Sequence, residues 1–311
     1  MRIRRSAGGV AAVLLALTAC GTAPDKPLSS EPTARDPAAE EQGTKGPVEP
    51  PASGDAGARF GPALFGSDSA TIDNPWWPHT PGTRFVYEGQ ALDENESIDR
   101  RIVSTVTDLT KEIAGVCALL VWEQDFDDDV MVEAELSFRA QDARGNVWHL
   151  GEYTEVYEDE EYIGNRVWVP GDPEGAQAGL LMPADPKPGD PSFSEGYAPP
   201  PWNWDDRGRV RERADEVCVE AGCYQDVLVF EEFEPSIRNA FQLKYYAREV
   251  GHVQVGWDGE NETEQEELEL VDMVELTPAE LDEARGEALA MEGRAQAYAR
   301  LGPAQPVGEG K

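Results

Sequence analysis

The segment VMVEAELSF, residues 130–138, alternates apolar and polar residues, and VWHLGEYTEVY, residues 147–157, shows a similar alternation. Successive side chains of a β-strand point to opposite faces, so a period of two predicts strands with two chemically different faces. Between the two segments, Gly145-Asn146 predicts a tight turn. Together the segments predict one antiparallel hairpin.

Similar short segments, separated by turn residues, fill most of the chain after residue 82. They do not alternate with helical segments, which argues against a β-α-β fold with a parallel sheet. We therefore predict a mainly β domain built as an antiparallel meander. Strands are expected at 83–87, 101–109, 115–125, 131–142, 147–157, 167–169, 209–219, 224–233, 242–247, 251–257 and 268–275.

One C-terminal α-helix is predicted over residues 277–301. It begins with Thr277-Pro278-Ala279-Glu280, which combines a capping hydroxyl, proline at the first helical position and glutamate at the third. Gly302-Pro303 ends it, and residues 302–311 are expected to form a loose tail. Apolar residues at spacings of three or four predict a stripe that packs on the sheet or, as the weaker alternative, on a partner. The stripe contains Leu281, Ala284, Ala288, Met291, Ala295 and Tyr298.

The first twenty residues have the layout of an export signal. Residues 1–5 are basic, and the small apolar residues 7–17 are too few to span a bilayer. Leu17-Thr18-Ala19-Cys20 resembles the lipobox of bacterial lipoproteins. This resemblance implies that the signal peptide, residues 1–19, is removed and that Cys20 becomes a diacylated N-terminus, with palmitate as one acyl chain. Two acyl chains hold a soluble domain stably on a membrane.

The expected location is therefore the extracytoplasmic face of the cell membrane, with the lipid anchor as the membrane contact. The alternative is an ordinary signal peptide with a coincidental cysteine. No other stretch of the sequence is apolar over the ~18 residues that a spanning helix needs.

The chain is strongly acidic, with 61 Asp and Glu residues against 26 Lys and Arg and a formal charge of −35 at pH 7. Binding to nucleic acid requires basic residues that displace counterions, so we predict no nucleic-acid partner. The charge also repels anionic lipid headgroups. It permits capture of a cation, but solubility, particularly at high salt, is the simpler explanation.

Residues 20–70 are predicted to form a disordered tether, because they are rich in Pro, Ala, Gly, Ser and Glu and poor in large apolar residues. Residues 71–276 form the expected acidic β domain, in which Trp76 and Trp77 are heavy core anchors. Within this domain, the proline-rich residues 171–206 are predicted to be a long loop with little regular structure.

Trp202 and Trp204, in the stretch PPPWNWDD of that loop, have two interpretations. In the one we favour, the loop folds back and both indoles enter the core. In the alternative they form the lip of a binding site for a peptide, a glycan or an apolar ligand.

Three cysteines follow the export signal. Cys218 and Cys223 flank Ala221-Gly222, a turn, and the compartment outside the membrane is oxidising, so a disulfide that pins a hairpin tip is expected. A pair that includes Cys117 is the alternative, because connectivity does not follow from sequence. If it is not paired, Cys117 is expected to be a buried apolar residue. Neither the spacing nor the nearby histidines favour a zinc site.

Asp125, Asp127 and Asp129 occupy alternate positions, as in the calcium-binding loop of an EF-hand. The sixth position of such a loop requires glycine and the twelfth glutamate, but Val130 and Leu136 stand there. An exposed hairpin tip is therefore the better interpretation, and calcium at these three residues is the weak alternative. We predict no other metal and no cofactor.

No catalytic constellation is evident. His79, His149 and His252 lie outside any H-E-x-x-H pattern, and no G-x-S-x-G motif is present. Paired carboxylates for glycoside chemistry are conceivable, but 61 acidic residues always supply some pair. We therefore expect no enzyme and name no catalytic residue, with a carboxylate-dependent hydrolase as an alternative.

Four blocks of sequence resemble an uncharacterised family of secreted bacterial proteins, over residues 74 to about 257. The resemblance implies export and assigns no activity. The last block also resembles the final strands of the curved sheets in lipoprotein-type carrier folds, which implies a curved sheet or incomplete barrel. Cys218 and Cys223 depart from the family's pattern. The blocks are NPWWPHTPGTRFVYEG (74–89), AQDARGNVWHLGE (140–152), GLLMPADPKPGD (179–190), and YQDVLVFEEFEP with KYYAREVGHVQ (224–235 and 244–254).

The function expected from these features is a non-catalytic surface binding or envelope module, with a glycan, an envelope protein or a small apolar ligand as its partner. The first alternative is a carrier of a lipid or another apolar ligand inside the curved sheet. An apolar cavity above roughly a few hundred Å³ would favour this carrier, and a solid core would exclude it.

Overall fold

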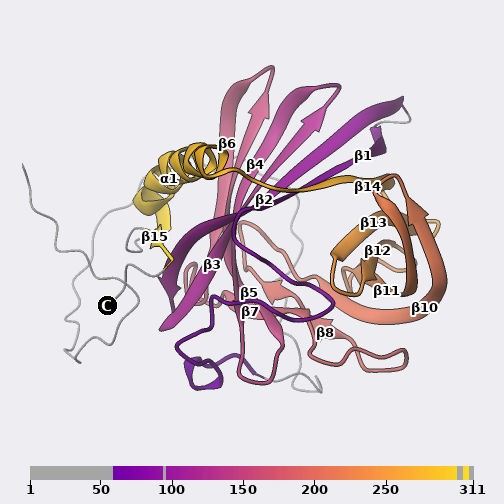
Figure 1. Ribbon diagram of the computed structural model, residues 1–311, viewed down its shortest axis with the longest axis horizontal. Helices are drawn as coiled ribbons and strands as arrows, with labels where there is room; N and C mark the ends of the chain where they lie inside the picture. The colour runs from indigo at the N-terminus through magenta and orange to yellow at the C-terminus, as the bar shows by residue number, and fades with distance from the viewer. Residues whose placement is uncertain (1–58, 94–95, 300–303, 308–311) are drawn as a thin grey trace, which may run out of the picture.

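The computed structural model describes residues 59–93, 96–299 and 304–307. Its regular structure is one curved antiparallel sheet and one α-helix, α1 (Pro278–Ala299), near the C-terminus (Figure 1). The sheet does not close into a barrel, because its path ends at two short strands, β8 (Phe193–Ser194) and β9 (Gly196–Tyr197). The predicted fold class, a curved antiparallel meander with one C-terminal helix, is confirmed.

Two meanders make up most of the sheet, and the remaining strands attach to them. The first contains β1 (Thr83–Asp93), β2 (Glu96–Ile113), β3 (Val116–Asp127), β4 (Val130–Gln141) and β5 (Val147–Glu158). The second contains β10 (Arg207–Val219), β11 (Gly222–Phe233), β12 (Phe241–Ala247), β13 (Gly251–Asp258) and β14 (Glu266–Glu275). Between them in sequence, β6 (Glu161–Trp168) and β7 (Gln177–Met182) both pair with β5.

The two meanders join where β1 pairs with β14. The strand order is β8-β10-β11-β12-β13-β14-β1-β2-β3-β4-β5-β7-β9. Phe85 of β1 lies opposite Ser104 of β2 on one side and Met273 of β14 on the other. The first long strand of the chain is therefore at the centre of the sheet, and one curved surface runs from the second meander into the first.

The alternation in the sequence separates two faces of the first meander, and α1 covers one of them. Leu136 and Phe138 of β4 are buried on the outer face, in a core shared with Ala288 and Met291 of α1. The helix contacts β2, β4 and β6 on this face (Figure 1). The polar residues that alternate with this apolar set therefore point to the inside of the curved sheet.

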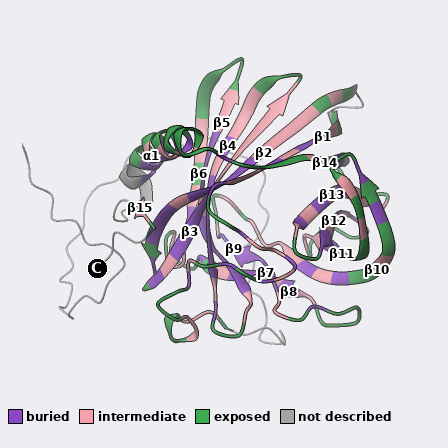
Figure 2. Cartoon of the chain, in the orientation of Figure 1, coloured by how far each residue is buried: buried purple, intermediate pink, exposed green. Residues whose placement is uncertain are grey.

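The C-terminal helix begins with a reciprocal cap and packs by its small-residue stripe. The backbone N–H of Thr277 donates to Oε2 of Glu280 at 2.8 Å, and the N–H of Glu280 donates to Oγ1 of Thr277 at 3.4 Å. The sheet-facing side of α1 is buried and its outer side is exposed (Figure 2). Beneath it, Lys111 of β2 and Glu292 of α1 form a buried ion pair.

Residues 59–70, which the sequence assigns to the tether, belong to the folded domain. They include the short 3₁₀-helix η1 (Pro62–Leu64). Phe60 packs edge-on against Trp148 of β5 with ring centroids 5.9 Å apart. The backbone N–H of Gln141 donates to the Ser69 carbonyl at 2.8 Å. A few apolar residues in a polar segment are enough here, because their partners come from distant strands.

Two other segments are more regular than the sequence predicts. Residues 171–206, expected to be a long loop, contain the strands β7, β8 and β9. In the expected tail, β15 (Gln305–Pro306) pairs with β2, and Ala304 before it is buried. Both segments are rich in proline, which predicts a loop. Their short strands form only because neighbouring strands of the sheet pair with them, and proline is tolerated at such edges.

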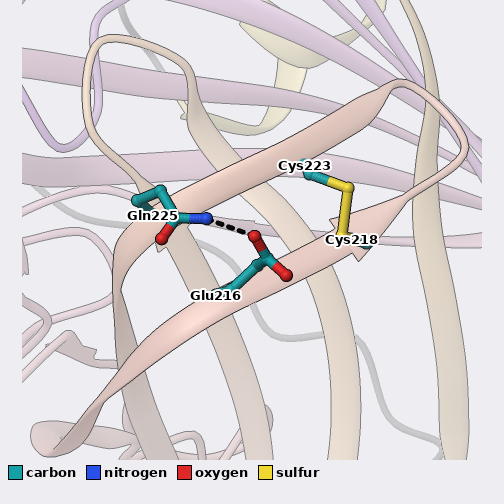
Figure 3. Close-up of a disulfide and its surroundings, with 4 residues drawn as sticks. All are labelled: Glu216, Cys218, Cys223 and Gln225. Atoms are coloured by element: carbon teal, nitrogen blue, oxygen red, sulfur yellow. Dashed lines mark hydrogen bonds between the residues drawn. A yellow bond between two sulfur atoms is a disulfide. The ribbon is translucent and has the colours of Figure 1, made fainter.

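Cys218 and Cys223 lie opposite each other in β10 and β11 and form a disulfide near the tip of this hairpin (Figure 3). Beside it, the amide of Gln225 donates to the carboxylate of Glu216 across the same two strands. The N–H of Ala221 at the tip donates to a carbonyl of β14 at 3.0 Å. The disulfide therefore fixes a hairpin tip that also contacts β14.

Replacing both cysteines, Cys218→Ser with Cys223→Ser, is expected to lower the free energy of unfolding by about 2 kcal/mol, because the closed loop is short. Guanidinium unfolding followed by tryptophan fluorescence measures this change. The far-UV circular dichroism spectrum should stay that of the wild type, since backbone hydrogen bonds hold the rest of the hairpin. Collapse of the fold in the double variant would contradict the local role given to the disulfide.

Candidate functional site

A cavity of about 360 Å³ lies on the inner face of the curved sheet. Both meanders contribute to its wall, together with the segment before β1 and the region between β7 and β10. The wall contains aromatic rings, all three histidines, two cationic side chains and many carboxyl groups. The carboxyl groups are those of Glu123, Asp125, Glu133, Glu135, Glu195, Asp206 and Glu232.

The strands supply this wall through every second residue. Within one strand, residues i and i+2 share a face, so a pair such as Lys244 and Tyr246 of β12 points into the cavity together. In β3 the inward pair is Glu123 and Asp125, and in β4 it is Glu133 and Glu135. The polar face that alternation predicts is thus the face that lines the cavity.

We call these four residues, Glu123, Asp125, Glu133 and Glu135, the β3–β4 acidic group. Glu123 lies directly opposite Glu135 and Asp125 directly opposite Glu133 in the strand register. Like charges in directly opposed positions destabilise a strand pair. Two acid pairs side by side on an inner face therefore need a compensating interaction.

Burial and crowding shift the proton affinity of this group. Burial first, and then the charges of Glu133 and Glu123, raises the pKa of Asp125 to about 8. Burial also raises the pKa of Glu135, with repulsion from Glu152 adding to it. These carboxyl groups bind a proton more readily than solvent-exposed ones.

A second cluster, Glu195, Asp206 and Glu232, forms the β11 acidic group on another part of the wall. Burial, followed by repulsion from Glu232, raises the pKa of Asp206 to about 7, although a hydrogen bond from Trp204 acts against the shift. Burial raises the pKa of Glu195 well above its ordinary range, and Glu232 and Asp206 add to this. Lys244 is the cation that this cluster faces.

Arg139 is the best-connected cation of the wall. Its guanidinium donates to Oε2 of Glu123 at 2.9 Å, to Nε2 of His79 at 2.9 Å and to Oγ of Ser137 at 3.2 Å. It also lies over the ring of Trp77, with Cζ 5.1 Å from the ring centroid. Arg139 therefore neutralises one member of the β3–β4 acidic group and ties β4 to the segment before β1.

The three histidines of the wall are held neutral. Burial and then Arg139 lower the pKa of His79 and of His149 to about 3, and burial and then Lys244 do the same for His252. His79 accepts a hydrogen bond from Arg139 and faces the Trp77 carbonyl through Nδ1 at 3.2 Å, which fits a neutral ring protonated at Nδ1. Such rings organise the wall and do not carry charge at neutral pH.

Aromatic rings surround the acidic groups in two clusters. On one side Tyr246 packs against Trp77 at 5.3 Å, against His252 at 5.3 Å and against Phe230 at 5.1 Å between ring centroids. On the other side Trp204 packs against Trp168 at 5.2 Å and His149 at 5.8 Å. Flat apolar surface therefore lies beside carboxyl groups in both parts of the cavity.

A smaller pocket of about 150 Å³ adjoins this cavity. Asp206 and Glu232 line both spaces. The other polar residues of the smaller pocket include Glu234, Glu262 and Glu264. The acidic lining thus continues beyond the main cavity.

The two tryptophans singled out in the sequence lie in the folded domain, half-buried, and only one lines the cavity. The indole of Trp202 donates to the Val167 carbonyl at 3.0 Å and packs with Trp168. Trp204 lines the cavity wall. Gly179 and Gly196 permit this arrangement, because a side chain at either position would collide with atoms packed against it in this loop region.

The three aspartates considered for calcium do not form one ligand set. Asp125 faces the cavity, Asp127 accepts a hydrogen bond from Arg100 at 2.7 Å, and Asp129 is 94 % exposed at the hairpin tip. In the described part of the chain, no group of three or more Asp, Glu, His or Cys residues is placed to hold a metal ion. Only Asp125 of the three belongs to the candidate site.

Cys20 lies outside the described residues, and Cys117 is half-buried in β3, outside the disulfide. Within the described ranges, no helix combines the length and the apolar character needed to cross a membrane.

Sequence reasoning missed most of this wall. It interpreted Asp125, Asp127 and Asp129 as an exposed hairpin tip, and it named neither the β11 acidic group nor Arg139. The available signal was the alternation in residues 130–138, which places Glu133 and Glu135 on a common face. Whether that face meets solvent or a cavity depends on strands far away in the sequence.

No family model and no curated protein matches the chain. Two solved structures align with it. One, from Bacteroides fragilis, is provisionally named an exported protein with a YmcC-like fold; it is 12% identical over 64% of this chain and 98% of that one, with a TM-score of 0.37. The other, from Parabacteroides distasonis, is provisionally named a lipoprotein; it is 10% identical over 65% and 99%, with a TM-score of 0.35. At this similarity neither structure bears on the role of this chain.

The pKa of Asp125 gives a prediction for stability against pH. Because its pKa is higher in the folded protein, the folded state keeps a proton that the unfolded state releases, so this group costs stability as pH rises toward about 8. The histidines, with lowered pKa values, change stability only below about pH 6.5 and in the opposite direction. Stability should therefore fall between about pH 6.5 and about pH 8.

Asp125→Asn should raise the melting temperature at about pH 8 and flatten this decline, since the amide has no charge to bury. Differential scanning calorimetry at several pH values measures both effects, and the difference from wild type should shrink toward about pH 5. Asp129→Asn, on the exposed tip, is the matched control and should follow the wild-type curve. Equal curves for Asp125→Asn and wild type would refute the assignment.

Proposed function

We propose that this protein is an exported, lipid-anchored binding module whose inner cavity takes up a small polar ligand. One observation carries the proposal: a cavity of about 360 Å³ has carboxyl groups on its wall that have no partner among the residues the structure describes. Ligand pockets span roughly 300–1,000 Å³ and combine apolar surface with a few polar groups. The cavity volume and the aromatic rings beside the acids agree with this description.

The composition of the wall argues against an apolar ligand. A carrier of lipid requires an apolar interior, because a carboxyl group that faces a hydrocarbon chain loses hydration without a compensating bond. The β3–β4 and β11 acidic groups occupy two parts of the wall. The lipid-carrier alternative is therefore disfavoured relative to a ligand with polar groups.

The pKa values favour binding over hydrolysis. Glycoside hydrolysis by two carboxyl groups needs environments that push their pKa values apart, so that one is an acid while the other is ionised. Here burial raises the pKa of Asp125, Glu195 and Asp206 in the same direction. These three carboxyl groups therefore do not show the opposed shifts that hydrolysis needs, whereas they suit a charged or hydrogen-bonding ligand.

Filling the cavity tests this function. Ser104 is buried in β2 and lines the cavity, so Ser104→Phe should occupy part of the space and eject a bound molecule. Native mass spectrometry of protein purified from its own host should find a small molecule on the wild type and lose it in this variant. Ser236→Phe, at an exposed loop position, is the matched control. No bound molecule on the wild type from any growth condition would refute a binding role.

The membrane anchor is supported by the layout of residues 1–20 and has its own test. Cys20→Ser should abolish incorporation of radioactive palmitate in growing cells and move the protein from the detergent phase to the aqueous phase, because Cys20 is the proposed attachment point of the acyl chains. Cys117→Ser, which leaves Cys20 in place, should incorporate label like the wild type. Label retained in Cys20→Ser would contradict the anchor.

A further inference from the structure

We propose that the ligand of the cavity is a small organic amine, whose ammonium group is bound by the inward-facing carboxylates Asp125, Glu195 and Glu232. This inference rests on the proposed binding function and names the chemical class of its ligand. It is based on the excess of carboxyl groups over cations on the cavity wall, beside aromatic rings, where three of these acids have no partner among the described residues.

The first step is that these carboxylates lack partners. Within the described residues, the side chains of Asp125, Glu195 and Glu232 make no hydrogen bond and no salt bridge, although all three line the cavity. Glu195 is only 7% exposed. Burial without a partner disfavours the ionised form of such a carboxyl group, so the group holds a proton more readily. A ligand ammonium that supplies the missing donors would stabilise the ionised form in place of the proton.

The second step is the sign of the missing charge. Seven carboxyl groups line the cavity against two cations, Arg139 and Lys244. Arg139 is already engaged with Glu123, and Arg166, from β6, pairs with Glu133 at 2.9 Å. The groups that remain can accept hydrogen bonds when ionised but cannot donate them. The complementary ligand is therefore a cation that donates.

Lys244 shows that an ammonium group suits this environment. Burial by itself lowers the pKa of Lys244, but Glu232 and its acidic neighbours outweigh burial, so the pKa is raised overall. Its ammonium makes no salt bridge within 4.0 Å to a described residue, so it does not occupy the carboxylates. A ligand ammonium that reaches them directly would experience the same favourable potential at shorter distance.

The wall favours an organic cation over a metal ion. In the described ranges, no three Asp, Glu, His or Cys residues are positioned as a ligand set for a metal. The rings of Tyr246 and Trp204 line the cavity and provide apolar surface for an alkyl chain, and aromatic faces attract cations. The volume of about 360 Å³ accommodates a molecule of many atoms and not only a single ion.

The positions of the acidic residues favour a ligand with two amino groups over a ligand with one. The β3–β4 acidic group comes from the first meander, while the β11 acidic group comes from the second meander and the segment before it. A molecule with an ammonium group at each end could satisfy both. The smaller pocket, which shares Asp206 and Glu232 and adds Glu234, Glu262 and Glu264, would attract such a cation toward the cavity.

Isothermal titration calorimetry on the purified wild type tests the class of ligand directly. The probes are 1,4-diaminobutane, n-butylamine and the uncharged isostere 1,4-butanediol. We expect binding of the diamine at least about tenfold tighter than that of the monoamine, and no binding of the diol, because each ammonium makes charge-assisted hydrogen bonds. Diol binding equal to that of the diamine, or the absence of amine binding, would overturn the inference.

Two variants test the site. Glu195→Gln and Glu232→Gln should each weaken diamine binding by about tenfold or more, since each removes one charged acceptor. Glu269→Gln makes the same charge change at an exposed position of β14 and should bind like the wild type. Circular dichroism and the melting temperature establish that each variant is folded. Equal weakening in all three variants would indicate nonspecific attraction to an acidic surface and would overturn the site.

Proton release provides a readout that does not depend on any variant. Glu195 faces Glu232, Asp206 and Lys244, and its pKa is raised in the free protein. An ammonium that binds there should therefore expel protons, and the heat of binding near neutral pH should change with the ionisation enthalpy of the buffer. Diamine binding without buffer dependence would place it elsewhere on the molecule.

The outcomes also separate this inference from the proposed function. If amines fail to bind but Ser104→Phe removes an uncharged copurified molecule, the binding function stands and the assignment of an amine as the ligand is wrong. If no probe binds and no molecule copurifies, both are wrong.

Discussion

Charge that faces inward is the constraint on which this structure depends. On β3 and β4 two pairs of acidic residues lie directly opposite each other, inside a curved sheet, where the free energy of each charge is set by its partners and not by bulk water. Arg139 offsets part of this repulsion and also contacts His79 and Trp77 in the segment before β1. One guanidinium thus links the carboxyl groups of the cavity to the segment before β1, which contributes Trp77 and His79 to the wall.

The two faces of the first meander differ in composition: one packs against α1, and the other lines the cavity. The outer face is apolar and carries α1, so its buried area contributes to the stability of the sheet. A second buried core, which includes Trp148 of β5 and Phe230 of β11, adds to it. This leaves the inner face free to hold polar groups that an ordinary sheet core excludes. A functional site can depart from the rules of core packing when packing elsewhere supports it.

The acidic residues of the chain fall into an exposed set and a buried set, which the amino-acid composition cannot distinguish. Many acidic residues are exposed, such as Asp129 at its hairpin tip, and these serve solubility. Others, such as Glu195, are buried at the cavity and bind protons unusually well. The pKa values of the buried set depend on the fold, because they are set by desolvation and by neighbouring groups from distant strands. The exposed residues contribute charge and solubility wherever they lie on the surface.

The sequence by itself determined the local features: strand positions from period-two alternation, the start of α1 from its capping box, and the cysteines that flank one turn. Each of these depends on residues a few positions apart, so physical rules of short range are sufficient. Tertiary structure alone decided that Glu133 and Glu135 face a cavity and not solvent, that Trp204 but not Trp202 reaches it, and that residues 59–70 join the domain. These outcomes follow from the curvature of the sheet and from the pairing of β1 with β14, which brings together residues almost two hundred positions apart in the sequence. A local sequence pattern therefore cannot determine which face of a strand will line the cavity.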